Sequence, residues 1–154
     1  MKRFLKTSLS ILSILFISIA LVGCGEKVDP ADVAVKLINY NQENVVPKVI
    51  DGLLSSQSNA VEKVYEETNA KLKEEFSSYM SENALDTYLL KSQSALVTYL
   101  SEQKLPITMG EPKVEEGSSQ IITIPFKDAS QNEGELVFQV QMRDGKIGFI
   151  KFVQ

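Results

Sequence analysis

The sequence predicts an α+β domain in which N-terminal helices pack on one face of a C-terminal antiparallel sheet of three to four strands. Apolar residues recur every three or four positions up to about residue 102, as on one face of a helix. After Pro106 they alternate with polar residues, which is typical of strands. Asp144-Gly145 is the strongest hairpin signal in the chain and favours a type I′ turn. Because the helices precede the strands, we expect them to form separate layers.

The first helix is expected from Pro30 to about Leu54. Asp29 is a good N-cap residue, and proline is favoured at the first helical position. Pro47 should kink or split this helix, because it lacks an N–H donor and clashes with the preceding turn. The polar residues of Ser55–Asn59 have the composition of a turn and predict a connection.

A second helix is expected from about Asn59 to Met80, with one apolar and one charged face. A solvated surface is the simpler interpretation of the charged face, and an acidic docking face for a partner is the alternative. The charged residues are Glu62, Lys63, Glu66, Glu67, Lys71, Lys73, Glu74 and Glu75.

A third helix is expected from about Ala84 to Glu102, with Ser81 or Asn83 as its cap. Tyrosines recur at helical spacing here and in the preceding helix, which indicates core positions with hydroxyls reaching water. Lining a pocket is the alternative interpretation. These tyrosines are Tyr65, Tyr79, Tyr88 and Tyr99.

Three strands are expected at Gln120–Lys127, Glu135–Arg143 and Lys146–Val153, and Ile107–Val114 is a candidate fourth. Proline cannot donate to a sheet ladder, so Pro125 indicates an edge or a bulge. In the middle strand the alternation places Leu136, Phe138, Val140 and Met142 on one face.

The N-terminus has the organisation of a secretory signal. Met1–Lys6 carries three basic residues and no acid, and Thr7–Val22 then runs sixteen residues without a charge. A helix of that length reaches only about 24 Å, short of the roughly 30 Å hydrocarbon core of a bilayer. The pattern therefore favours a cleaved signal over a permanent transmembrane helix.

Leu21-Val22-Gly23-Cys24 at the end of this segment resembles the lipobox of bacterial lipoproteins. The resemblance implies cleavage between Gly23 and Cys24 and attachment of a diacylglycerol, with acyl groups such as palmitate, to the Cys24 thiol. It divides the chain into a signal peptide (1–23), a short tether (24–29) and a single domain (30–154). The alternative is a buried, unreactive Cys after an ordinary signal peptide.

Two acyl chains anchor a protein stably, so we expect an extracytoplasmic protein on the cell membrane, and the composition suggests a Gram-positive source. Removing residues 1–23 leaves 13 basic and 20 acidic residues, a net charge of −7. That balance argues against nucleic acid as a partner, because nucleic-acid binding needs a basic surface. The membrane contact is expected through the lipid at Cys24.

Signals for catalysis and metal binding are weak, and we predict no catalytic, cofactor-binding or metal residue. The chain has no His and one Cys, which removes the commonest acid–base catalyst and metal ligand. Without a His base, Ser55-Ser56 and Ser118-Ser119 are interpreted as loop residues. The acids Glu111, Glu115 and Glu116 lack the spacing of a calcium loop and are interpreted as a solvated loop.

Helices followed by a curved antiparallel sheet, ending in the hairpin Glu135–Val153, resemble the nuclear-transport-factor-2-like (cystatin-like) superfamily. Its enzymes hold acidic, His and Tyr side chains in a cone between helix and sheet, and no such position is matched residue by residue here. The resemblance implies a cone that is packed shut or binds a small apolar ligand. We therefore expect a non-enzymatic module that binds an envelope protein or a small apolar ligand. The alternatives are a small enzyme using carboxylate and Tyr chemistry, and an immunity or surface-exclusion lipoprotein.

Overall fold

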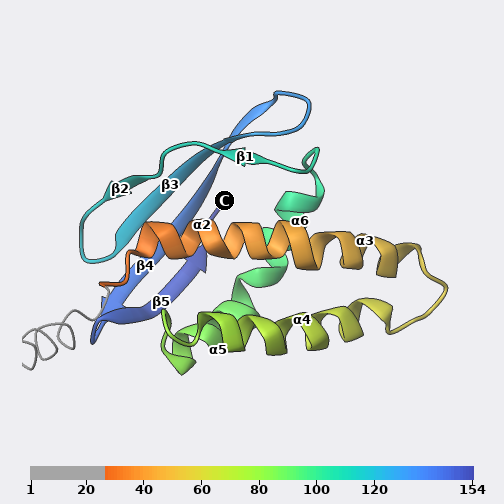
Figure 1. The fold of residues 1–154 in the computed structure, drawn as a ribbon, viewed down its shortest axis with the longest axis horizontal. Coiled ribbons are helices and arrows are strands. Elements are labelled where there is room, and N and C mark those ends of the chain that lie inside the picture. Colours follow the sequence, from red (N-terminus) through yellow and green to blue (C-terminus); the bar gives the residue numbers. More distant parts are fainter. Residues whose placement is uncertain (1–26) are drawn as a thin grey trace, which may run out of the picture.

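The computed structural model describes residues 27–154, and it has the expected α+β architecture with helices packed on a C-terminal antiparallel sheet (Figure 1). The helical elements are α2 (Pro30–Tyr40), the π-helix η1 (Asn41–Val45), α3 (Val46–Leu54), α4 (Ala60–Phe76), α5 (Glu82–Lys91) and α6 (Gln93–Ser101). The strands are β1 (Thr108–Met109), β2 (Lys113–Glu115), β3 (Gln120–Lys127), β4 (Glu133–Arg143) and β5 (Lys146–Phe152).

The first helix is one long rod with an altered turn in its middle (Figure 1). Asp29 caps its start, since the Asp29 carboxylate accepts a hydrogen bond of 2.9 Å from the Ala31 N–H. Pro47 can neither donate to the carbonyl four residues back nor fit closely against it. The preceding turn, η1, is widened to π-helical geometry, and the Val46 N–H bonds to the Asn41 carbonyl five residues back. The expected effect of Pro47 is confirmed, and the split takes the form of a π-helix.

The second helix ends at Phe76, four residues before the expected Met80, because the chain turns there to meet the sheet. Met80 forms an isolated parallel bridge with Ile147 of β5. The Ile147 N–H donates to the Tyr79 carbonyl and the Ser81 N–H donates to the Ile147 carbonyl, each at 2.9 Å. Ser81 then caps α5 by accepting from the Ala84 N–H at 3.2 Å.

The prediction of one continuous helix from Ala84 to Glu102 is wrong, because the helix breaks at Ser92 into α5 and α6. Ser92 has φ of −123°, outside the helical region. Tyr88 and Gln93 are both buried although they lie five residues apart, which on a straight helix would point them about 140° away from each other. The break allows both side chains to face the interior.

The sheet has the order β1-β3-β4-β5, and β2 also pairs with β3, all antiparallel. The candidate strand Ile107–Val114 is present as two short strands, β1 and β2. The Pro125 carbonyl accepts from the Gly110 N–H at 2.7 Å, so the missing donor of Pro125 faces the gap between β1 and β2. Asp144 and Gly145 have φ of 52° and 78°, which confirms the type I′ turn.

The core fills the space between the helices and the inner face of the sheet. Large side chains less than 2% exposed come from both layers, among them Leu72, Phe76 and Tyr88 from the helices and Ile122 and Phe138 from the sheet. Leu136, Phe138 and Val140 are buried as the alternation predicts, whereas Met142 is 38% exposed. Met142 follows an irregularity in the pairing of β4 with β5, which explains its exposure.

One close approach within the sheet involves Phe126 of β3 and Gly134 of β4, which pair directly across the strands. The Phe126 ring lies over Gly134, and a Cβ added there would be 2.5 Å from the ring atom Cζ. Phe126 is 4% exposed, and its ring packs edge-on against Tyr99 of α6. The absence of a side chain at Gly134 therefore leaves room for the Phe126 ring to pack between the sheet and α6.

Candidate functional site

The predicted lipidation and cleavage residues, Cys24 and Gly23, lie outside the described residues. The described chain starts at Lys27, three residues after Cys24. Lys27 and Val28 share a surface pocket with Gly145 of the β4–β5 turn. The chain therefore enters the domain beside the closing hairpin, at the end of the rod where α2 begins (Figure 1).

Tyr88 is the one tyrosine of the predicted set that is fully buried. Its hydroxyl accepts a hydrogen bond of 3.0 Å from the Asn41 side-chain amide. Burial raises the pKa of Tyr88 above its ordinary value, and the bond from Asn41 opposes this only in part. A phenol held neutral in this way is a structural group, since its uncharged form is stabilised.

The other tyrosines are half-buried at the margins of the core. The Tyr99 hydroxyl donates to the Glu135 backbone carbonyl at 3.3 Å, and the Tyr79 hydroxyl accepts from Lys36 Nζ at 3.3 Å. Tyr65 packs against the core from α4, and burial raises its pKa. Neither of these hydrogen bonds joins a tyrosine hydroxyl to a carboxylate, and the arrangement favours core positions over a shared pocket.

Lys36 forms the most connected charged group on the helical surface. Its ammonium lies 2.8 Å from the Asp32 carboxylate and 4.5 Å from the centre of the Tyr79 ring. The hydrogen bond with Asp32, followed by that with Tyr79, raises the pKa of Lys36. Lys36 is therefore held protonated, which suits it to binding and not to nucleophilic attack.

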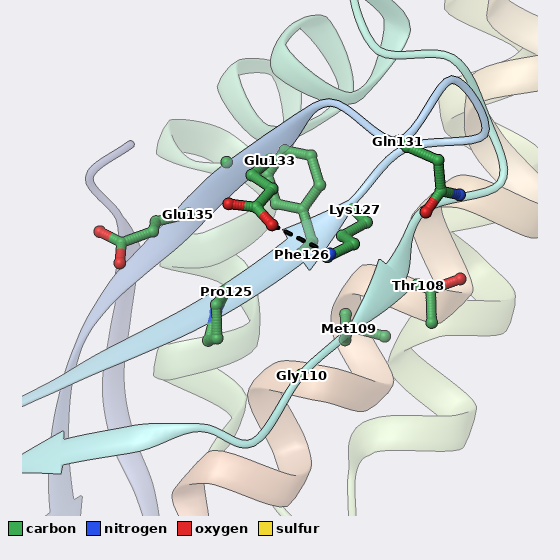
Figure 2. A pocket seen from close by; sticks show the side chains of 10 residues that line it. Thr108, Met109, Gly110, Pro125, Phe126, Lys127, Gln131, Glu133 and Glu135 are labelled. Carbon is green, nitrogen blue, oxygen red and sulfur yellow. Dashed lines mark ion pairs between the residues drawn. The ribbon is translucent and has the colours of Figure 1, made fainter.

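A groove of about 730 Å³ lies at the end of the sheet where β1, β3 and β4 meet (Figure 2). Figure 2 shows that Pro125, Lys127, Glu133 and Glu135 project from strands β3 and β4 along this groove. Lys127 Nζ and Glu133 Oε1 are 2.9 Å apart. Both side chains are more than half exposed, so this pair contributes little to stability. The groove offers mixed charges for surface contact.

The groove has no signal in the sequence, because its charged residues, such as Lys127, Glu133 and Glu135, belong to the solvent-facing half of the strand alternation. The loop between β3 and β4 that borders it is held by Asp128, which is 4% exposed. The Asp128 carboxylate accepts from the backbone N–H groups of Ser130 and Asn132, each at 2.8 Å, and from the Asn132 side chain at 2.9 Å. These bonds, that of the Asn132 side chain foremost, lower the pKa of Asp128.

The other sequence candidates take structural positions. Ser119 Oγ accepts from the side-chain amides of Gln139 and Gln141 at 3.1 and 2.9 Å, which fixes the loop before β3. Ser55 Oγ donates to the Gly52 carbonyl at 2.8 Å at the end of α3. Glu111, Glu115 and Glu116 are exposed, and within residues 27–154 no group of three or more His, Cys, Asp or Glu side chains is placed to hold a metal ion.

The architecture defines an α+β domain with a buried core between helices and sheet and grooves on its surface. The chain matches no protein-family model, no curated protein and no solved structure. Between residues 27 and 154 no helix combines the length and apolar character needed to cross a membrane. The resemblances to bacterial lipoproteins and to the nuclear-transport-factor-2-like superfamily stay predictions.

Proposed function

We propose that this chain is a bacterial lipoprotein, held on the extracytoplasmic side of the cell membrane by a lipid on Cys24. The observation that carries the proposal is the position of the chain's one Cys, directly after sixteen uncharged residues and within Leu21-Val22-Gly23-Cys24. The start of the described domain supports it, since the Asp29 cap of α2 leaves only a short tether after Cys24. A short tether would keep the domain close to the membrane.

We propose further that the domain is a non-enzymatic module that binds an envelope protein or a small apolar ligand. The packing between the helices and the sheet supports this role, because the large side chains of Leu72, Phe76 and Phe138 are 0% exposed there. Binding would then use the surface, where the groove of Lys127 and Glu133 offers a hollow of about 730 Å³. The order of helices and curved sheet also supports the nuclear-transport-factor-2-like assignment as a proposal.

The anchor is tested by growing cells with a clickable fatty acid and following the tagged chain. The wild type should take up label and fractionate with membranes, whereas Cys24→Ala should take up none and appear in the medium or remain unprocessed. Gly25→Ala, which changes the residue directly after Leu21-Val22-Gly23-Cys24, is the matched control and should keep the label. An unlabelled wild type would overturn the proposal.

The binding role is tested by crosslinking in intact cells, followed by pull-down through a C-terminal tag. Recovery of one stoichiometric partner supports the module. The paired variant Lys127→Ala with Glu133→Ala changes the groove without touching the core, and Lys73→Ala with Asp86→Ala removes a comparable exposed ion pair elsewhere. Loss of the partner in the first variant alone would place the contact at the groove, and recovery of no partner from the wild type would count against the module.

A further inference from the structure

Two irregularities of the helical layer meet inside the domain, and both carry buried polar side chains. One is the π-helix η1, which begins at Asn41, and the other is the break at Ser92. The hydrogen bond between the Asn41 amide and the Tyr88 hydroxyl joins them, and α6, which begins at Gln93, packs against η1. The Ser92 N–H bonds to the Tyr88 carbonyl at 2.9 Å, so the break lies directly after the turn that carries Tyr88.

These side chains are closed off from the surface and incompletely bonded. Asn41 is 0% exposed, and Ser92 and Gln93 are each 1% exposed. Asn41 Oδ1, Ser92 Oγ and both amide atoms of Gln93 have no hydrogen-bond partner among the described residues. A buried polar atom without a partner costs about 1–3 kcal/mol, so these four atoms need an explanation.

Rotating the Asn41 amide does not remove the problem. Its nitrogen donates to the Leu37 carbonyl at 2.7 Å and to the Tyr88 hydroxyl at 3.0 Å. Exchanging the nitrogen and oxygen would set the amide oxygen against the Leu37 carbonyl, and two acceptors would then face each other. Oδ1 is therefore the atom that needs a donor from elsewhere.

We propose that Asn41, Tyr88, Ser92 and Gln93 line an internal binding site for ordered water. The occupant must donate to the amide oxygens of Asn41 and Gln93 and accept from Gln93 Nε2, and water does both. It must be uncharged, because the one charged side chain among the buried residues described is Asp128, in the β3–β4 loop. Leu37 and Leu96, one helical turn from Asn41 and Ser92, are both 0% exposed, so the occupant must be a very small molecule.

The first test replaces Gln93 by methionine, which has a similar length and no amide, in the full-length protein purified in detergent. If water completes the hydrogen bonds, Gln93→Met breaks a satisfied network and lowers the urea midpoint of unfolding. If the amide is buried dry, the substitution removes two unpaired atoms and raises the midpoint, which would overturn the proposal. Gln57→Met, in the exposed connection between α3 and α4, is the matched control and should leave the midpoint unchanged.

The second test separates water from a rearrangement in which the side chains bond directly to one another. A high-resolution crystal structure of the wild type should show water within hydrogen-bond distance of the amides of Asn41 and Gln93. Direct bonds between these side chains, with no water between them, would overturn the proposal whatever the midpoint of Gln93→Met.

Discussion

Replacing Gly134 by alanine tests the close approach between β3 and β4. The added Cβ would lie 2.5 Å from Cζ of Phe126, whereas carbon atoms in contact normally lie about 3.5–4.0 Å apart. The ring must therefore move by about 1 Å. It has little freedom to do so, because Phe126 is paired with Met109 on one side and Gly134 on the other, and Tyr99 packs against its ring.

Overpacking of this kind costs about 1–3 kcal/mol, which exceeds the roughly 0.5–1 kcal/mol that alanine gains over glycine in backbone entropy. We expect Gly134→Ala to lower the free energy of unfolding by about 1–2 kcal/mol, measured by urea denaturation followed by circular dichroism. The double variant with Phe126→Leu should lose less than the sum of the two single variants, because the smaller side chain frees the space that Cβ needs. A Gly134→Ala protein as stable as the wild type, or strictly additive effects, would refute the reasoning.

Three further predictions concern the turn, the helical tip and the β3–β4 loop. Gly145→Ala should lose about 1–2 kcal/mol in urea denaturation through backbone strain alone, since φ is 78° and an added Cβ meets no atom within 4 Å; an unchanged midpoint would contradict the I′ geometry. Leu53→Ser with Leu54→Ser, at the end of α3, should change the free energy of unfolding by no more than about 0.5 kcal/mol per site, because these side chains are 71% and 82% exposed. Leu72→Ala, whose side chain is 0% exposed, should lose about 2–5 kcal/mol. Equal losses in the two variants would show that the end of α3 is covered. The pKa of Asp128 is lowered in the folded state, so its contribution to stability is present above its ordinary pKa of 3.8 and is lost as the pH falls through the lowered value. The stability difference between wild type and Asp128→Ala should therefore be full at neutral pH and shrink in acid, and a difference that grew in acid would contradict the hydrogen-bonded carboxylate.

Local signals in the sequence were sufficient for the fold class and for most elements. The alternation in β3 and β4, the Asp144-Gly145 turn and the Asp29 cap act within a few residues, so each is visible without tertiary information. Pro47 predicts a kink or a split of the first helix, but the π-helical form of the turn before it has no signal in the sequence. The break at Ser92 has no local signal, because neither Gly nor Pro is present and the need to bury both Tyr88 and Gln93 is tertiary.

The candidate sites also divide into one that a local sequence signal predicts and others that depend on tertiary packing. Cys24 is recognised by its place after an apolar segment, which is a property of sequence order. The groove brings together Lys127 and Glu133, which are 6 positions apart in the sequence. The buried polar cluster brings together Asn41 and Tyr88, which are 47 positions apart. Their polar side chains look like ordinary surface residues until the packing is known.

The bridge between Met80 and Ile147 also affects how copies of this domain meet one another. An open strand edge is a template on which another chain can add a strand and begin to aggregate. On β5, Tyr79 and Ser81 already occupy the N–H and C=O of Ile147, next to the hairpin. At the opposite edge, β1 and β2 have two and three residues and are separated by a gap. The β5 edge is therefore interrupted at Ile147 and the opposite edge is short and divided, which protects this sheet against edge-to-edge association.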